Sequence, residues 1–403
     1  MGTLGGYGCR MSVAAPKSTP RPHFAALDGF RGLLALFVAV YHTIWMSWPN
    51  ASAFLNNGAV IIDLFFAFSG FLMFTLYADQ LGPDGAVRDF MAKRFARLFP
   101  LHLFMLAAFV GFAVLRLAAH AYGLAQSDPG EVLPFQPGAV DSWRNLLAHL
   151  TMTHAMGGAD SLAFNPPSWT VGAEFYTYAA FAGVAAVFAG RKLGPVGAAA
   201  LLVGIVALYA TLALVKPDMD VTFDLGLLRC LAGFAIGCLA ARARQLGWFT
   251  LGRQATPVEV SVLALSIAFT VYCGGKLQFL VGPVLFLFVV VFTQDKGAVS
   301  RLMSARPFPM LARISYSVYL THVLIAIGFD IVVGQALGGV WPDWRAHHGF
   351  GTLLLLPYIA TVIGVSLLTY RFVELPGGQW LRHRLCQRQR PAVDEAVPAH
   401  GPL

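Results

Sequence analysis

The chain has 403 residues, of which 57% are hydrophobic and 12% are charged, and its formal net charge is +8. Soluble globular proteins carry about 45–50% apolar and about 25% charged residues. A core of this length cannot hide such an apolar excess, so the composition excludes a soluble enzyme, and it also excludes intrinsic disorder, which needs low hydrophobicity and high charge. The remaining class is a polytopic membrane protein, whose positive charge reflects cytoplasmic loops rather than nucleic-acid binding.

Residues 1–26 contain no apolar run and are expected to form a disordered cytoplasmic tail rather than a cleaved signal peptide. A membrane-spanning helix needs about 20 mainly apolar residues. Ten segments meet this requirement: 28–48, 58–78, 98–120, 167–190, 195–215, 223–241, 256–274, 278–293, 311–333 and 351–373. The sequence therefore predicts an all-α membrane bundle over residues 27–376, followed by a short basic cytoplasmic tail at 377–403.

The distribution of basic residues predicts the orientation of this bundle. If the N-terminus is cytoplasmic, 22 of the 28 lysines and arginines fall on the cytoplasmic side. The positive-inside rule then places both termini in the cytoplasm, and an even number of spans agrees. The long outer segment 121–166 is expected to hold a short helix near 142–154, and its final prolines stop that helix before the next span. We find no nucleotide-binding loop and no internal repeat, which disfavours an ATP-driven pump. The five cysteines are scattered and suggest neither a metal site nor a disulfide framework.

The first span carries three ionisable residues, Asp28, Arg31 and His42. Arg31 and His42 differ by about 20° of helical rotation and lie about 16 Å apart along the axis, and Asp28 is offset from His42 by about 40°. Charged groups that face lipid are costly, so this stripe should face protein or water. A neutral histidine there could take a proton from a hydroxyl nucleophile as a general base. The alternative is an Asp28–Arg31 ion pair at the helix start, with His42 merely hydrogen-bonded to another helix.

Other ionisable residues suggest further sites. Arg94 and Arg97 are three apart and share one helix face, an arrangement that suits phosphate recognition, although positive-inside topology alone also explains them. Asp63, in the second span, is expected either to pair with an arginine or histidine or to contact substrate. Arg371 and Glu374 are three apart at the cytoplasmic end of the last span, so we expect an ion pair that closes that helix.

Trp169 and Glu174 follow a proline break near the outer surface. Trp169 is either an interfacial anchor or a surface on which a sugar stacks. Glu174 needs a partner within the membrane, and it could orient His42, bind sugar hydroxyls or pair with an arginine. His322, in the ninth span, is expected to be a hydrogen-bonded structural or pocket residue. Gly70 would permit close approach of another helix.

The run LDGFRGLLALFVAVYH at residues 27–42, with Arg31 and His42 separated by ten residues, resembles the opening signature of the membrane-bound acyltransferase-3 family. Members of that family are bacterial enzymes that O-acylate surface sugars, lipids and small molecules. Five later segments are similar to the family's other motifs, in order: Asp63–Met73, Lys93–Pro100, Asn165–Tyr176, Ser315–His322 and Tyr370–Pro376. One departure is Ala173, which stands where many members carry a second acidic residue and leaves Glu174 as the single acidic candidate.

The resemblance implies a multi-pass enzyme of the bacterial inner membrane that moves an acyl group, expected to be acetyl, from acyl-CoA to a sugar hydroxyl. The acceptor would be an envelope or exported glycan or glycolipid, and no metal is implied. His42 would be the general base, with Glu174 also catalytic, and CoA phosphates would meet Arg94 and Arg97. Substrate contacts would come from Asp28, Arg31, Asp63, Trp169 and His322.

The competing hypothesis is a proton-coupled secondary transporter with a relay formed by Asp28, His42, Asp63 and Glu174. Ten spans with buried ionisable groups would suit it equally well. A proton relay does not need the paired arginines Arg94 and Arg97, whereas a CoA site does.

Overall fold

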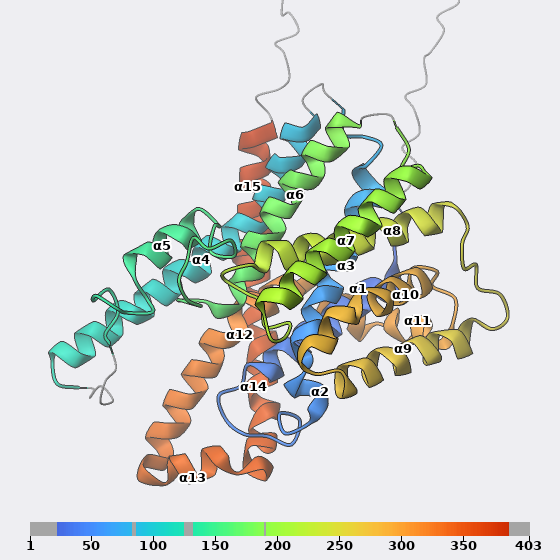
Figure 1. The fold of residues 1–403 in the computed structure, drawn as a ribbon. Helices are drawn as coiled ribbons and strands as arrows, with labels where there is room; N and C mark the ends of the chain where they lie inside the picture. Colours follow the sequence, from blue (N-terminus) through green and yellow to red (C-terminus); the bar gives the residue numbers. More distant parts are fainter. Residues whose placement is uncertain (1–21, 83–85, 125–131, 189–190, 387–403) are drawn as a thin grey trace, which may run out of the picture.

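A computed structural model describes residues 22–82, 86–124, 132–188 and 191–386, and in these ranges every regular element is a helix (Figure 1). The elements in chain order are α1 (Ala25–Tyr41), α2 (Ala53–Asn56), η1 (Gly58–Val60), α3 (Ile61–Tyr77), α4 (Ala86–Ala121), α5 (Trp143–Leu150), η2 (Pro166–Ser168), α6 (Trp169–Val187), α7 (Pro195–Val215), α8 (Gly226–Gln245), α9 (Ala255–Tyr272), η3 (Gly275–Val281), α10 (Gly282–Phe292), α11 (Ala298–Met303), α12 (Pro307–Leu337), η4 (Gly338–Val340), α13 (Trp341–Ala346), α14 (His348–Thr369), η5 (Tyr370–Glu374) and α15 (Leu375–Cys386).

The predicted all-helical membrane bundle is confirmed. Each of the ten predicted spans coincides with a helix, and in the described ranges eight helices are long and apolar enough to cross a membrane. The other two are α1, with 17 residues, and α6, with 19. The short helix expected near 142–154 is α5. The predicted cytoplasmic termini stay a prediction, and most of both predicted tails lies outside the described residues.

Helix α4 starts twelve residues earlier than the span predicted at 98–120. Its 36 residues extend about 54 Å, well beyond a hydrocarbon core of about 30 Å. The missed part, residues 86–97, is too charged to resemble a span, although it continues the same helix. Figure 1 shows α4 running from the end of the bundle near α15 out to one side, so the helix joins the region of Arg94 to the lateral segment with α5.

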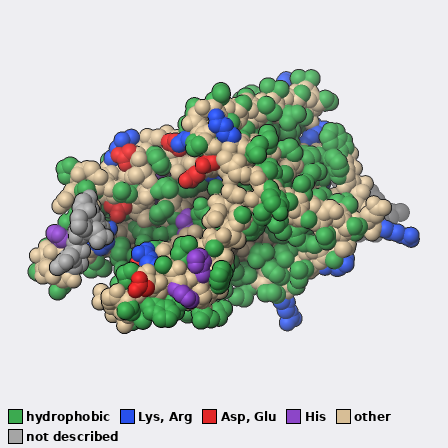
Figure 2. Space-filling view, turned by 60° about the horizontal axis from the view of Figure 1, so that its bottom comes forward, with side chains coloured by type: hydrophobic (Ala, Val, Ile, Leu, Met, Phe, Trp, Pro, Cys, Tyr) green, Lys and Arg blue, Asp and Glu red, His purple; other side chains and the backbone are tan. Residues whose placement is uncertain are grey.

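The outer surface of the helices is apolar. Leu115, Val203 and Leu214 are examples of exposed side chains on α4 and α7, with 68%, 68% and 83% of their surface accessible. Figure 2 shows hydrophobic side chains gathered densely over the right-hand part of the visible face, whereas charged and histidine side chains lie mainly toward its left. Since soluble monomers rarely expose such contiguous apolar area, this surface fits burial in lipid.

Helix α1 packs inside the bundle through small and aromatic residues. A Cβ at Gly29 would lie 2.2 Å from the carbonyl oxygen of Met303 on α11, so only glycine permits this approach. On the same helix the Phe30 ring packs edge-on against Phe288 and Phe292 of α10, at 4.9 and 4.7 Å between centroids. These contacts hold α1, which carries Arg31 and His42, in a fixed position.

Helices α3 and α8 also pack closely, and Gly70 plays the part expected of it. A Cβ at Gly70 would lie 1.9 Å from the carbonyl oxygen of Phe234, and one at Gly237 would lie 2.0 Å from that of Ala67. The two backbones therefore nearly touch. This contact brings the start of α3, with Asp63, against the start of α8.

The prediction that Arg371 and Glu374 form an ion pair is wrong. Residues 370–374 form a π-helical turn, in which residues three apart no longer share a face. The turn buries Glu374, which is 4% exposed, while Arg371 stays outside and lies 5.7 Å from the Phe372 ring. Glu374 is bound instead by Arg97 of α4 and by Ser317 of α12, whose hydroxyl donates to Oε2 at 2.7 Å.

Candidate functional site

A cavity of about 180 Å³ lies where α1 ends and where α3, α6 and α8 begin. Its lining includes His42 and Trp169, which the sequence analysis singled out, and Arg229, which it did not. The full lining is Phe37, Val38, Tyr41, His42, Gly58, Ala59, Ile62, Leu162, Pro166, Pro167, Trp169, Asp220, Thr222, Arg229 and Tyr319. A histidine, aromatic rings, hydroxyls and a carboxylate in one hollow suit a hydroxylated, partly apolar ligand.

Arg229 organises the wall of this cavity and was not singled out by the sequence analysis. It is 1% exposed, and its Nε and Nη2 donate to the carboxylate of Asp63, with Nη2 at 2.8 Å from Oδ2. Its remaining donors reach the carbonyl oxygens of Ala59, Met219 and Val221. The sequence did contain a signal that could have identified it. Arg229 lies inside the apolar span predicted at 223–241, and a charged side chain there needs a partner.

Trp169, the first residue of α6, stands on the other side of Arg229. The guanidinium carbon of Arg229 lies 5.5 Å from the indole, a cation–π contact, and the Phe66 ring packs edge-on at 5.9 Å. The backbone of α8 approaches so closely that a Cβ at Gly226 would lie 2.7 Å from the indole ring. Trp169 is 6% exposed and held on three sides, so its ring is a rigid part of the cavity wall rather than a free interfacial anchor.

His42 caps the C-terminal end of α1 and is paired with His322 of α12. His42 Nδ1 lies 2.9 Å from the carbonyl oxygen of Val38 and 3.3 Å from Nε2 of His322. Nδ1 of His322 lies in turn 3.1 Å from the carbonyl oxygen of Val318. The structure therefore joins the histidines of the first and ninth predicted spans, which lie 280 positions apart in the chain.

These contacts fix the tautomer of both rings. A carbonyl oxygen only accepts, so Nδ1 of His322 must carry the proton, and in the neutral ring its Nε2 is an acceptor. His42 Nδ1 faces two acceptors, the Val38 carbonyl and His322 Nε2, and must also carry a proton. The neutral His42 ring thus keeps its lone pair on Nε2. Tyr358 of α14 steadies both helices, because its hydroxyl lies 3.0 Å from the Ala39 carbonyl and 3.2 Å from the His322 carbonyl.

A second group of charged residues includes Arg94 and Arg97 in the first turns of α4. Figure 1 shows that α4 begins at the same end of the bundle where α15 ends. Arg94 of α4 donates to the hydroxyl of Tyr77 at 3.2 Å and lies within 5.3 to 5.8 Å of the rings of Tyr77, Phe90 and Tyr178. Its Nε is buried without a hydrogen-bond partner among the described residues. This guanidinium is held by aromatic faces, which leaves donors free for a ligand.

Arg97 sits one turn further along α4. It forms an ion pair with buried Glu374 and lies 5.2 Å from the Tyr316 ring. Its side chain is 38% exposed, and its charge interacts with that of Arg31 on α1. Three arginines from two helices therefore gather in this part of the bundle, with Glu374 as the counter-ion of one of them.

Glu174 of α6 accepts hydrogen bonds from Ser69 of α3 and Tyr178 of its own helix. Its charge acts on Arg97 and on the hydroxyl of Tyr319 alike, which places it between the arginine group and the cavity. In the described ranges Glu174 makes no hydrogen bond to His42. Of the three roles the sequence suggested, orienting His42 is therefore not seen.

Asp28 lies apart from both groups. Its carboxylate is 3.1 Å from Nε2 of His23, and their side chains are 35% and 72% exposed, so it faces the surface at the start of α1. The Asp28–Arg31 ion pair, which the sequence offered as an alternative, does not occur in the described part of the chain. The stripe of three ionisable residues is thus split into Asp28 at the surface, Arg31 beside Arg97 and His42 in the cavity.

Three buried histidines form a stack that no sequence spacing indicated. His102 of α4 lies 5.6 Å from His154, and His149 of α5 lies 4.1 Å from His154, with their ring planes nearly parallel. Burial lowers the pKa of His149 to about 4, and burial also lowers that of His154. Their nitrogens contact carbonyl oxygens, His154 Nε2 reaching that of Ser168 at 2.8 Å. Across the described ranges no three His, Cys, Asp or Glu side chains are placed to hold a metal ion.

Comparisons with known proteins identify relatives of this chain. The chain is 34% identical over 171 residues to "Protein 2 in picA locus" of Rhizobium radiobacter, a match that covers 41% of this chain and 83% of that protein. It is 31% identical over 101 residues to "Putative peptidoglycan O-acetyltransferase YrhL" of Bacillus subtilis (strain 168), covering 25% of this chain and 15% of that protein. No solved structure matches. The acyltransferase domain of the acyltransferase-3 family matches residues 24–371, and the chain, a multi-pass membrane enzyme, belongs to that family.

Proposed function

We propose that the protein is an O-acyltransferase that moves an acyl group, in the simplest case acetyl, from acyl-CoA to a sugar hydroxyl of an envelope or exported glycan or glycolipid. The relative from Bacillus subtilis, named as a peptidoglycan O-acetyltransferase, supports acyl transfer to a surface glycan. The observation that carries the proposal is the position of His42. It lines the 180 Å³ cavity, and its neutral ring holds the lone pair on Nε2.

In this proposal the acceptor enters the cavity and stacks against Trp169, with Asp220 and Tyr319 as hydrogen-bonding partners. The acceptor oxygen attacks the thioester carbonyl while its proton passes to His42 Nε2. The carbon–sulfur bond then breaks, the thiolate of CoA leaves, and the proton on His42 protonates that thiolate or passes to solvent. The acyl ester of the acceptor and free CoA are the two products.

Arg31, Arg94 and Arg97 would hold the phosphates of CoA. Guanidinium groups bind phosphate through charge-assisted paired hydrogen bonds, and the Nε of Arg94 lacks a protein partner. Arg31 and His42 are separated by about 16 Å along α1. The pantetheine arm of CoA would cross this distance past Glu174 and Tyr319.

The transporter hypothesis gains no support from the geometry. Asp63 is engaged by buried Arg229 and Asp28 pairs with His23 near the surface. In the described residues neither is hydrogen-bonded to His42 or Glu174, so the four residues form no continuous relay.

The test uses purified full-length protein in detergent with labelled acetyl-CoA, and it follows both binding and loss of acetyl from the thioester. Wild type should bind and turn over acetyl-CoA when a glycan acceptor is supplied. His42→Ala should bind normally and lose about 10²- to 10⁴-fold in turnover, the range typical of a general base. Arg94→Ala/Arg97→Ala should lose binding.

Matched controls separate these effects from charge and folding. Arg253→Ala/Lys276→Ala changes two exposed residues outside both groups and should behave as wild type. Because Arg97 pairs with Glu374, Arg97→Lys tests whether charge alone keeps the fold and part of the binding. A folded wild-type protein that binds no acyl-CoA would refute the donor assignment.

A further inference from the structure

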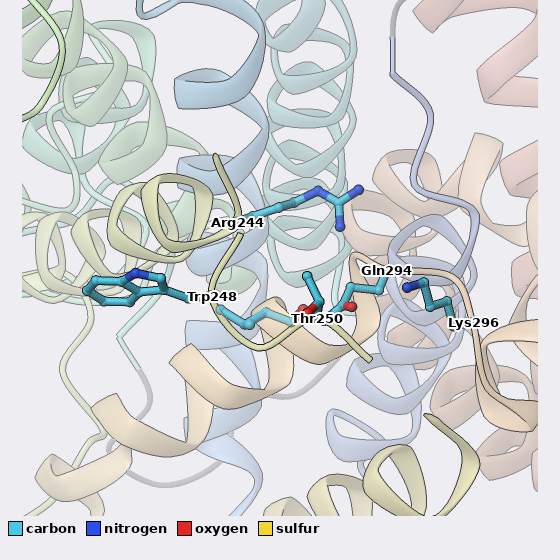
Figure 3. Close-up of a pocket in the computed structure, with 6 residues that line it drawn as sticks. Arg244, Trp248, Thr250, Gln294 and Lys296 are labelled. Carbon is cyan, nitrogen blue, oxygen red and sulfur yellow. The ribbon is translucent and has the colours of Figure 1, made fainter. Parts of the chain in front are cut away.

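A separate basic pocket of about 280 Å³ lies between the α8–α9 connection and the residues that follow α10 (Figure 3). Its lining is Arg244, Trp248, Thr250, Val290, Gln294 and Lys296. In Figure 3 the side chains of Arg244 and Lys296 extend toward the same space, and the Trp248 indole lies at the far end, pointing away. None of these residues belongs to the cavity around His42 or to the arginine group of α4.

The floor of the pocket is held in place by Gln294. Its Nε2 donates to the Phe249 carbonyl at 2.7 Å, and its Oε1 accepts from the Leu251 amide at 2.7 Å. Lys296 Nζ donates to the Leu251 carbonyl at 2.6 Å, which uses one of its three protons. The connection is thus fixed in position before any ligand arrives, which reduces the ordering cost of binding.

The pocket carries uncompensated positive charge. Among the described residues Arg244 has no hydrogen-bond acceptor, and its guanidinium carbon lies 5.3 Å from the Phe24 ring. The nearby acid is Asp295, whose oxygens accept from the amides of Ala25 and Ala26, at 3.2 and 2.8 Å. That carboxylate is already hydrogen-bonded to the positive N-terminal end of α1, so it offsets little of the positive charge of Arg244 and Lys296.

The rim of the pocket points to lipid rather than to water. Leu246, Trp248 and Phe249 are 49%, 58% and 54% exposed, directly beside Arg244. Tryptophan and other aromatic residues concentrate at membrane interfaces, and basic pockets between membrane helices bind anionic headgroups. A soluble phosphate ligand would gain nothing from these apolar side chains, whereas a phospholipid would place its chains against them.

We propose that this pocket binds the phosphate of an anionic phospholipid headgroup through Arg244 and Lys296, with the acyl chains against Trp248 and Phe249. The Thr250 hydroxyl, which makes no hydrogen bond within the described ranges, would add a donor. Because Asp295 joins this site to the start of α1, a bound lipid would also steady the helix that carries Arg31 and His42.

The test measures lipid binding to detergent-purified full-length protein by native mass spectrometry, with phosphatidylglycerol and phosphatidylcholine as the two probes. Two cations near a membrane surface should favour the anionic lipid by about 30-fold. Arg244→Gln/Lys296→Gln should remove this preference. Arg253→Gln/Arg382→Gln removes the same charge from exposed sites outside the pocket and should keep it.

Two results would overturn the proposal. One is an unchanged preference in the Arg244→Gln/Lys296→Gln variant. The other is displacement of phosphatidylglycerol from the wild type by millimolar ADP, which would make the site one for soluble phosphates. Arg244→Lys keeps the positive charge and should keep the preference for phosphatidylglycerol. It therefore shows whether a loss of preference in the double variant comes from the lost charge rather than from misfolding. None of these measurements depends on acyl transfer.

Discussion

The pairing of His42 with His322 leads to a graded kinetic prediction. His322→Leu removes one of the two acceptors of the His42 Nδ1 proton and roughly conserves the volume of a fully buried side chain. The Val38 carbonyl, 2.9 Å from the same nitrogen, still favours the reactive tautomer. We therefore expect the loss of one hydrogen bond, about 0.5–1.5 kcal/mol, which is about a twofold to twelvefold fall in kcat.

The control is His322→Gln, whose amide oxygen can take the place of Nε2 as acceptor and should restore most of the rate. The assay is steady-state acetyl-CoA turnover with a glycan acceptor, in which the KM for acetyl-CoA should stay constant in both variants. His322→Leu should also have little further effect in a His42→Ala background, since the two residues act as one unit. Equal rates for the leucine and glutamine variants, with both proteins folded, would refute the role assigned to His322.

Two further predictions concern the walls of the cavity, and a third concerns the histidine stack. Asp63→Ala leaves the charge of buried Arg229 uncompensated and should lower the free energy of unfolding by about 3–5 kcal/mol, measured by denaturation in detergent against Asp63→Glu. Unchanged stability would mean that water reaches the pair. Gly226→Ala places a Cβ 2.7 Å from the Trp169 indole and should raise the KM for the acceptor while acyl-CoA binding is kept; an unaltered KM would show that the indole does not contact the acceptor. Burial lowers the pKa of His149 to about 4 from an unfolded value of about 6.5, so its contribution to stability is complete above pH 6.5 and is lost as the pH falls through 4. Between pH 7.5 and 4.5 the melting temperature should fall less in His149→Asn than in wild type, and equal falls would contradict this account.

The fold class followed from the sequence because membrane helices obey local rules. Length and hydropathy alone located ten helical segments, since each must satisfy its own backbone hydrogen bonds within lipid. Helix boundaries and helix faces were predicted less well where hydropathy or regular α-helical geometry does not apply. The charged first part of α4, residues 86–97, continues a helix although it is too polar for a span, and the π-helical turn at 370–374 changes which residues share a face.

The sequence by itself singled out most of the ionisable residues that the helices bury. His42, Arg94, Arg97, Asp63 and Glu174 stand out because an ionisable side chain in an apolar helix is too costly to be incidental. Only the tertiary structure decided their partners: Arg229 for Asp63, Ser69 and Tyr178 for Glu174, Glu374 for Arg97 and His322 for His42. Each of these four residues has a partner 105 to 280 positions away in the chain, beyond the reach of helical periodicity, and only Tyr178 lies on the same helix as its partner. Partner choice depends on which helix faces meet, and small residues such as Gly70 and Gly226 set that packing through contacts across the bundle.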